Sequence, residues 1–304
     1  MNPFRRWLQN RARRAGKAAD RAEEQGRRHQ WFLLAGWRDQ TERCHPQAQT
    51  LQRIFPPDEV FWADPFAWSQ HGRYYVFVEE FVFATGRAHI SVIELDSHLQ
   101  PVGAPVPVVV EPRHLSYPFL FEFDGQLYMV PETSGTSSVD LYRCAEFPLR
   151  WQFVRTLIAG RALADATLFE HDGRWWLFCT AKQGKLRMNE TLFAFHADSP
   201  LSDQWSAHPA NPLVRDYSCA RPAGRVFRDA SGRLLRPSQD CVRRYGHALN
   251  LSEITTLTPR RFRERRVWRM SGEEAGGWRG LHHMDWHDGL LVMDALRLLP
   301  GDAA

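Results

Sequence analysis

The sequence has no run of about 18 apolar residues, so no segment is predicted to cross a membrane as a helix. Its five cysteines form no CxxC pair, and no secretory apolar region follows the N-terminus. Free thiols in a reducing compartment are the simplest interpretation, so we expect a cytoplasmic protein. Neither a GxxxxGK[ST] loop nor a GxSxG elbow occurs, and we expect no cofactor.

Excess positive charge is also missing from most of the chain. The net charge is +4, but residues 1–28 alone carry nine Lys or Arg and three Asp or Glu. Of the 39 basic and 35 acidic residues in the whole chain, 30 and 32 therefore lie beyond residue 28. A near-neutral globular part does not indicate a nucleic-acid-binding surface.

The basic N-terminal segment has a helical pattern. Apolar residues recur at spacings of three and four over residues 3–28, and basic side chains occupy the other positions. We expect a helical leader over residues 1–29, followed by one domain over 30–304. A solvated leader and weak association with an anionic membrane surface are both compatible with this composition.

One pattern recurs five times after residue 60: a strand with a polar opening, a turn with glycine, and a strongly apolar strand. The turn glycines are Gly72, Gly125, Gly173, Gly232 and Gly289, separated by 53, 48, 59 and 57 residues. Three of the turns are Asp-Gly, the strongest short hairpin signal. A period near 50 residues with several strands per unit is typical of a β-propeller. We therefore predict an all-β, five-bladed propeller whose blades begin near residues 61, 114, 162, 218 and 279.

The last blade is short of strands, because about a dozen residues follow Gly289. The apolar run 31–37 near the N-terminus is the obvious missing strand. A ring closed in this way has no exposed sheet edge at its seam. We predict that residues 31–37 pair with the last blade, and that residues 38–58 form a connecting loop.

Innermost strands of a propeller line its central channel, so their openings converge at one end. The five opening residues are Asp64, Tyr117, Asp165, Arg221 and His282. The second strands end in a further polar set: Glu79, Glu80, Glu132, Thr180, Gln239, Asp240 and Asp294. Unpaired buried charge is costly, so such a ring indicates either a binding site or a structural ion network.

A metal site is not predicted. His283, Asp285 and His287 would share one face of an alternating strand, whereas His282 would point the other way. Metal ligands have to converge on one point, and these four do not.

The stretch Asp64-Pro65-Phe66, followed by residues 72–77 (GRYYVF), resembles the opening of furanosidase-like glycoside hydrolase propellers of the family 43/32 type. That resemblance implies that Asp64 is the catalytic base and that Asp165 tunes the acid and orients substrate. The fourth blade has Arg221 where those hydrolases carry their general acid Glu. Hydrolysis needs two carboxyl groups, so Glu132 or Asp240 would have to replace it.

A resemblance over nearly the whole chain from about residue 30 is carried by residues 61–66 (FWADPF), 114–119 (HLSYPF), 131–133 (PET), 165–169 (DATLF), 220–224 (ARPAG) and 236–241 (RPSQDC). These resemble the N-terminal propeller domain of plant glucosamine inositolphosphorylceramide transferases. In the plant enzymes a separate glycosyltransferase domain follows. The resemblance therefore implies a glycan-related role without the activity of that second domain.

Our leading hypothesis is a carbohydrate-active protein that makes or modifies a surface polysaccharide or glycolipid, with its ligand at the channel mouth. The catalytic candidates are Asp64, Asp165 and Glu132. The substrate-binding candidates are Glu80, Tyr117, Arg221, Arg236, Gln239, Asp240 and His282. Arg221 and Arg236, with Arg243 and Arg244, would hold an anionic group such as a phosphate or uronate. The alternatives are a furanosidase-like hydrolase with a displaced acid, and a non-catalytic propeller that docks a partner glycosyltransferase.

Overall fold

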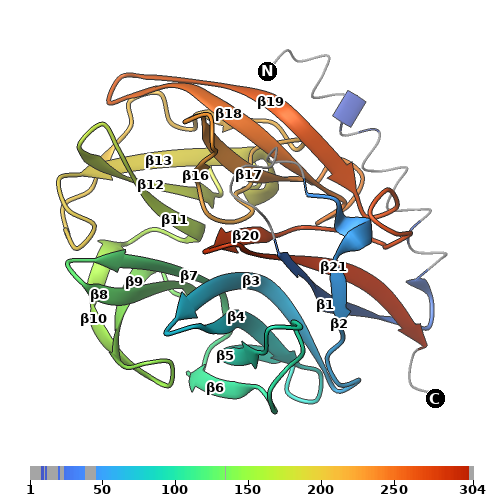
Figure 1. The fold of residues 1–304 in the computed structure, drawn as a ribbon. Helices are drawn as coiled ribbons and strands as arrows, with labels where there is room; N and C mark the ends of the chain where they lie inside the picture. Colours follow the sequence, from blue (N-terminus) through green and yellow to red (C-terminus); the bar gives the residue numbers. More distant parts are fainter. Residues whose placement is uncertain are drawn as a thin grey trace.

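The chain forms a ring of five antiparallel sheets, as a computed structural model describes it for residues 8–9, 11, 20, 24–37, 46–133 and 135–300 (Figure 1). Blade one contains β3 (Val60–Gln70), β4 (Arg73–Val82), β5 (Arg87–Leu95) and β6 (Val106–Val109). Blade two contains β7 (Leu115–Phe123), β8 (Gln126–Thr133), β9 (Ser138–Glu146) and β10 (Arg150–Ala159). The five-bladed, all-β architecture predicted from the repeats is confirmed.

Blades three and four are less regular. Blade three contains β11 (Leu163–His171), β12 (Arg174–Ala181), β13 (Thr191–Ala197), β14 (Ser206–Ala207) and β15 (Val214–Arg215), with the 3-10 helix η2 (Met188–Glu190) before β13. Blade four contains β16 (Phe227–Arg228), β17 (Leu234–Asp240), β18 (Ala248–Thr258) and β19 (Arg261–Ser271). Its innermost segment, residues 219–226, has no regular strand and forms an isolated β-bridge with β17, between Pro222 and Ser238.

The fifth blade joins both ends of the chain, as predicted. Its strand order is β2 (Gln52–Ile54), β1 (Arg27–Trp37), β21 (Leu290–Pro300) and β20 (Met284–His287). Strand β1 pairs with β21 along its whole length, from Arg27 opposite Pro300 to Trp37 opposite Leu290. In Figure 1 the blue β1 and the red β21 lie side by side.

Two local expectations need correction. The expected N-terminal helix lies largely outside the described residues and is not confirmed, and Arg27 and Arg28 belong to β1. The segment expected as a connecting loop contains the 3-10 helix η1 (Ala48–Thr50) and the short strand β2, which adds an outer strand to blade five. In the part of the chain that the structure covers, no helix is long and apolar enough to span a membrane.

Local sequence explains the hairpins. Asp124, Asp172 and Asp288 have φ of 55°, 52° and 47°, and each is followed by a glycine that also has positive φ. Two consecutive residues with positive φ make the tight turn whose twist matches that of the paired strands. The Asp-Gly signals in the sequence are therefore confirmed as hairpin turns.

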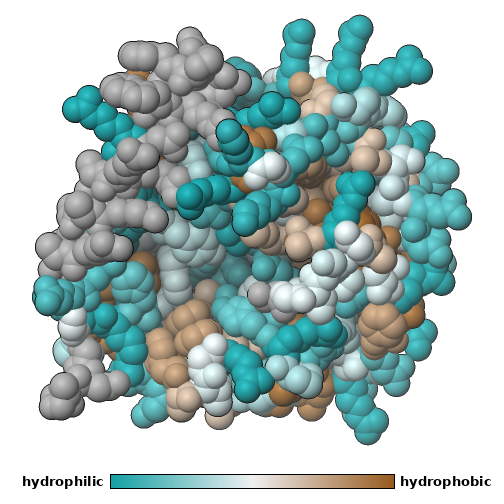
Figure 2. Space-filling view, turned by 180° about the vertical axis from the view of Figure 1, so that it is seen from behind, coloured by the Kyte–Doolittle hydropathy of each residue, from teal (hydrophilic) through white to brown (hydrophobic). Residues whose placement is uncertain are grey.

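The channel between the blades is filled in layers that join β3 to blade five. At successive levels the backbone N–H groups of Asp64, Ala67 and Ser69 donate to Asp294, Asp285 and His287, at 3.0, 3.0 and 3.2 Å. In the middle layer Arg225 forms a two-pronged ion pair with Asp285 (Nε to Oδ1 3.0 Å). These groups separate the two ends of the channel. On the face turned away in Figure 1, hydrophilic residues gather in a hollow near the middle (Figure 2).

Candidate functional site

Three blades share one backbone irregularity at the same position. Asp64, Tyr117 and Asp165 have φ of 49°, 46° and 55°, in the left-handed backbone region that residues other than glycine rarely adopt. Each lies in a β-bulge, where the register of the inner strand shifts against its neighbour. Bulges reorient side chains and are frequent beside functional sites. We call this end of the channel the mouth.

A histidine between two carboxyl groups forms the blade-five side of the mouth. His282 Nδ1 lies 2.6 Å from Asp294 Oδ2, and His282 Nε2 lies 3.4 Å from Asp64 Oδ1. Burial alone would lower the pKa of His282, but Asp294 and Asp64 raise it to about 9. The imidazolium of His282 in turn lowers the pKa of Asp294, although burial alone would raise it. His282 is therefore a cation at neutral pH, and Trp31 stacks on it with ring centroids 4.1 Å apart.

An arginine from blade four closes the opposite side. Arg221 Nε lies 2.7 Å from Asp165 Oδ2, and its NH2 donates to Asp165 Oδ1 at 3.1 Å. Its third nitrogen donates to Asn189 Oδ1 at 2.8 Å, and the guanidinium lies 5.0 Å from the ring centroid of Tyr245. The side chain that was expected to bind an anion is therefore occupied within the protein. Tyr245 is 42% exposed and forms part of the rim.

Glu132 lies between these two groups. The backbone N–H of Asp165 donates to Glu132 Oε2 at 3.3 Å. Burial and the neighbouring carboxylate of Asp165 raise the pKa of Glu132 to about 8. Its side chain is partly exposed. Glu132 thus carries a proton at neutral pH in a position that solvent can reach.

The carboxyl groups at the mouth outnumber the cations. Five carboxyl groups interact there: Asp64, Glu79, Glu132, Asp165 and Asp294. Three basic groups face them: Arg221, His282 and His114, whose hydrogen bond to Glu79 (3.2 Å) raises its pKa. We call these eight residues the mouth cluster.

The two extra carboxyls are Asp64 and Glu132. Glu79, Asp165 and Asp294 each have a close basic partner, whereas Asp64 shares His282 with Asp294. Burial raises the pKa of Asp64 well above its ordinary value, although His282 counteracts this. Within the described residues, Asp64 and Glu132 are therefore the mouth groups able to hold, give or take a proton.

Tyr117 lies below the mouth and is fully engaged. Its hydroxyl accepts a hydrogen bond from the Gly224 N–H at 3.0 Å and shares a second with Thr167 Oγ1 at 2.7 Å. It is 1% exposed. A Cβ on Gly224 would lie 1.8 Å from the Met284 carbonyl oxygen, so blade four can approach this closely only with glycine there. The structure places Tyr117 as a link between blades.

The remaining sequence candidates lie away from the open mouth. Arg236 is 1% exposed and forms a two-pronged pair with Glu264, with NH2 to Oε1 at 2.7 Å. Asp240 pairs with Arg269 of β19 at 3.0 Å. Gln239 is 1% exposed and contacts the carbonyl of Pro222 at 3.5 Å.

Other predicted charges also have partners. Glu80 accepts from the Trp62 indole at 2.9 Å and lies 3.3 Å from His89 Nε2. Arg244 pairs with Asp20 and Glu273, and Arg243 pairs with Glu273. The four arginines expected to bind an anion are all in ion pairs.

Sequence reasoning did not identify several site residues. His114 and Tyr245 lie outside the strand openings, and Asn189 belongs to η2. Asp294 had been noted only as a strand end, yet it also accepts the backbone N–H groups of His282 and His283 at 3.0 and 2.8 Å. A buried acid in the apolar strand β21 was the available signal.

The donor set does not suit a metal ion. Asp64, His282 and Asp294 offer ligand atoms that lie within 4.8 Å of one another. A metal needs a free lone pair on the imidazole, so an ion here would have to displace a proton from His282, whose pKa of about 9 keeps both nitrogens protonated at neutral pH. Both protons face carboxylates, so Asp64 and Asp294 share this single cation.

Most of the chain is similar to known proteins. Residues 47–295 match the model of the family described as glucosamine inositolphosphorylceramide transferase 1, N-terminal. The chain belongs to this family. It is 34% identical over 264 residues to glucosamine inositolphosphorylceramide transferase 1 of Oryza sativa subsp. japonica, which is 80% of this chain and 34% of the relative. The Arabidopsis thaliana protein of that name is 32% identical over 236 residues, 74% of this chain and 30% of the relative.

The chain thus spans about a third of the length of these relatives. Solved structures with similar folds include a family 117 glycoside hydrolase from Zobellia galactanivorans, with a TM-score of 0.55 and 12% identity over 87% of this chain and 90% of that one. Another is the catalytic domain of the Coprinopsis cinerea GH62 α-L-arabinofuranosidase, with a TM-score of 0.57 and 13% identity over 77% and 90%. At these identities the likeness shows the propeller fold.

Proposed function

We propose that the mouth binds a carbohydrate, and that the chain acts in building or modifying a surface glycan or glycolipid. The observation that carries the proposal is the surplus of two carboxyl groups in the mouth cluster. A carboxyl group accepts hydrogen bonds when it is ionised and can also donate one when it is protonated. Such groups suit sugar hydroxyls, which both donate and accept. The family relation supports the glycan context, because its plant relatives are transferases of a glycolipid by name.

In this proposal Glu132 donates a hydrogen bond or a proton to the sugar, and Asp64 accepts one from a hydroxyl. Asp165 and Arg221 fix the geometry through their mutual pair, and Tyr245 offers an aromatic ring at the rim. A sugar face can stack on such a ring. The paired state of all four candidate arginines argues for a neutral or cationic sugar in place of the anionic group expected from sequence.

A glycan array tests the proposal with the wild type and the Asp64→Asn and Glu132→Gln variants. Asn is the substitution of choice at position 64, because it tolerates the left-handed backbone there. We expect at least one glycan whose binding falls about tenfold or more in both variants. The exposed turn residue Asp172 provides the control Asp172→Asn, which should bind as the wild type does. Unchanged binding in both mouth variants would contradict the proposal.

A second candidate function is glycoside hydrolysis with a displaced acid. Glu132, with a pKa of about 8, is a carboxylic acid that keeps its proton at neutral pH, as a general acid must. Asp64 would be the base. Aryl furanosides and pyranosides test this directly: release of phenol by the wild type, lost in Glu132→Gln, supports hydrolysis. Binding without turnover in the same preparation would contradict hydrolysis and support glycan binding.

A further inference from the structure

A cavity lies at the end of the propeller channel opposite the mouth, where the hairpin turns of blades one, two and five meet. It has a volume of about 530 Å³, within the range of small-molecule sites. The Arg225–Asp285 pair and the layer around Tyr117 separate it from the mouth. We call it the hairpin pocket. It shares no residue with the mouth cluster.

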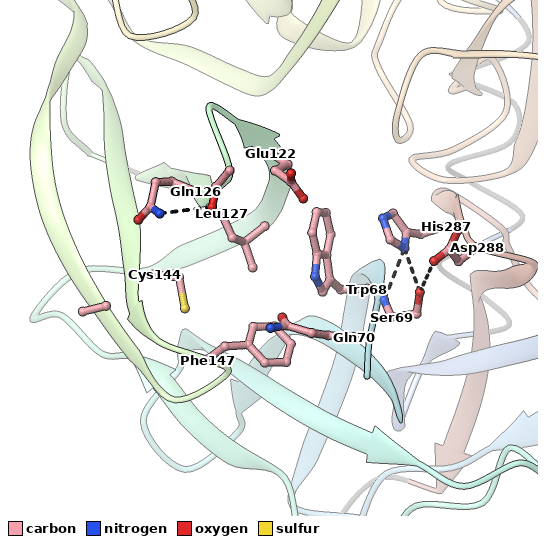
Figure 3. A pocket seen from close by; sticks show the side chains of 12 residues that line it. Trp68, Ser69, Gln70, Glu122, Gln126, Leu127, Cys144, Phe147, His287 and Asp288 are labelled. Carbon is pink, nitrogen blue, oxygen red and sulfur yellow. Dashed lines mark hydrogen bonds between the residues drawn. The ribbon is translucent and has the colours of Figure 1, made fainter. Parts of the chain in front are cut away.

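The pocket walls are fixed before any ligand arrives. Trp68 of β3 is 6% exposed and stacks on His287, with ring centroids 4.3 Å apart. The Ser69 N–H donates to His287 Nδ1 at 3.2 Å, and the Ser69 hydroxyl donates to Asp288 Oδ2 at 2.6 Å. Figure 3 shows Trp68 in the middle of the pocket, with His287, Ser69 and Asp288 on one side of it.

The hydrogen bond from Ser69 also fixes the state of His287. Because Nδ1 accepts, Nε2 must carry the proton of a neutral ring. Burial, with Arg225 nearby, lowers the pKa of His287 to about 4, so the ring is uncharged at neutral pH. His287 is therefore a neutral donor, not a binder of anions.

The remaining polar lining consists of amides and carboxylates. Gln70 and Gln126 contribute amides, Glu122 and Asp288 contribute carboxylates, and among the residues that the structure describes no Lys or Arg lines the pocket. The absence of cations disfavours phosphates and uronates. Planar amides and carboxylates beside aromatic rings instead suit the hydroxyl groups and C–H faces of an uncharged sugar.

We propose that the hairpin pocket is a second carbohydrate site, specific for neutral sugar units, on the end of the propeller opposite the mouth. Figure 3 shows Glu122 and Gln126 on the side of Trp68 away from Asp288. A sugar held there contacts groups from three blades at once. The chain then holds glycan at both ends of its channel, and binding at one end does not require the other.

The test uses Gln70→Ala/Glu122→Ala, a double variant at strand ends where neither residue is fully buried. The matched control is Glu170→Ala, since Glu170 occupies in blade three the place of Glu122 in blade two, three residues before the turn glycine. All proteins also carry Asp64→Asn, which disables the mouth. Binding is measured on an array of neutral gluco-, manno-, galacto-, xylo- and arabino-configured oligosaccharides, with uronate-containing glycans and a lysine-rich peptide included.

We expect a neutral oligosaccharide that is bound by the Asp64→Asn protein and by its Glu170→Ala derivative, and about tenfold or more weakly by the double variant. Uronate-containing glycans should not bind at this site. The proposal is overturned if no neutral glycan depends on Gln70 and Glu122. It is equally overturned if only the lysine-rich peptide does, because the pocket would then recognise a cationic protein segment.

Discussion

Arg221 forms an ion pair with Asp165, with Nε 2.7 Å from Oδ2, and does not present its guanidinium to the open mouth. The pair accounts for an arginine at the opening of blade four, on the rim of a site that is otherwise rich in carboxyl groups. It neutralises one carboxylate of the mouth cluster and leaves Asp64 and Glu132 as the groups free to exchange protons. The chemistry at this mouth therefore depends on which carboxyl groups have a cation of their own.

Removal of the cation from this pair should destabilise the fold. In Arg221→Met, Asp165 is left buried without its partner, which typically costs about 3–5 kcal/mol. Urea denaturation at pH 7 measures this loss in the free energy of unfolding. The double variant Arg221→Met/Asp165→Asn should recover a large part of it, because no unpaired charge is then buried. A loss below about 1 kcal/mol in the single variant would show that the pair does not hold the site together.

Glu132→Gln should change the pH dependence of stability. The native pKa of Glu132 is raised from 4.5 to about 8, so the native state holds a proton that the unfolded state releases. Ionising this group in the native protein opposes folding, and wild-type stability is lost as pH rises from about 4.5 to about 8. We expect the variant to gain stability relative to the wild type across that range. Urea denaturation from pH 4.5 to 8.5 measures it, with exposed Glu170→Gln as the control; parallel curves would contradict the raised pKa.

Asp294→Asn should lower the pKa of His282. The carboxylate of Asp294 is the largest influence that raises this pKa against burial. Without it, the effect of burial is less opposed, and we expect the midpoint to fall well below the wild-type value of about 9. Histidine ¹⁵N NMR measures the titration, and the His282 resonances are assigned by their loss in the His282→Gln variant. The cation of His282 contributes stability below pH 6.5 that is lost as pH rises through about 9, so this variant should also flatten that part of the stability curve. A midpoint that stays near 9 would assign the shift to another group.

Trp31→Ala tests the closure of the ring. Trp31 is 7% exposed and stacks on His282. Its ring also packs against Gly246 and Gly280, where the two backbones lie close together. Truncation of a buried Trp typically costs about 3–5 kcal/mol. Trp37, on the same strand but 46% exposed, is the matched control, and Trp37→Ala should cost about 1 kcal/mol or less. Equal losses in chemical denaturation would mean that β1 contributes through its backbone pairing and not through Trp31.

The repeats in the sequence were enough to predict the five blades, because Asp-Gly turns and alternating strands act locally. The strand at residues 31–37 was predicted from the deficit of strands in the last blade, and its pairing with β21 is confirmed. The polar openings of blades one and three were placed at the mouth because the aligned repeats put them at the same end of the inner strands. The inner segment of blade four, residues 219–226, departs from the pattern, and within it Gly224 packs directly on Met284.

Ion-pair partners could not be predicted from the sequence. Arg236 pairs with Glu264, and Asp240 with Arg269, from β17 across β18 to β19, and the register of β19 against β18 depends on two bulges. His114 reaches Glu79 from the neighbouring blade. A one-residue change of register turns side chains to the other face, so such partners follow only from the folded sheet. Which carboxyl groups lack a cation was therefore not visible in the sequence.

Direct titration of Glu132 tests the central claim of this account most closely. Protein with ¹³C-carboxyl-labelled glutamate is titrated from pH 3 to 10 by NMR, and the Glu132 resonance is identified by its loss in Glu132→Gln. A midpoint near 8 is predicted, because burial and Asp165 hold the proton on this carboxyl group. A midpoint near the ordinary value of 4.5 would show that Glu132 is already ionised at neutral pH and would contradict its role as a proton donor at the mouth.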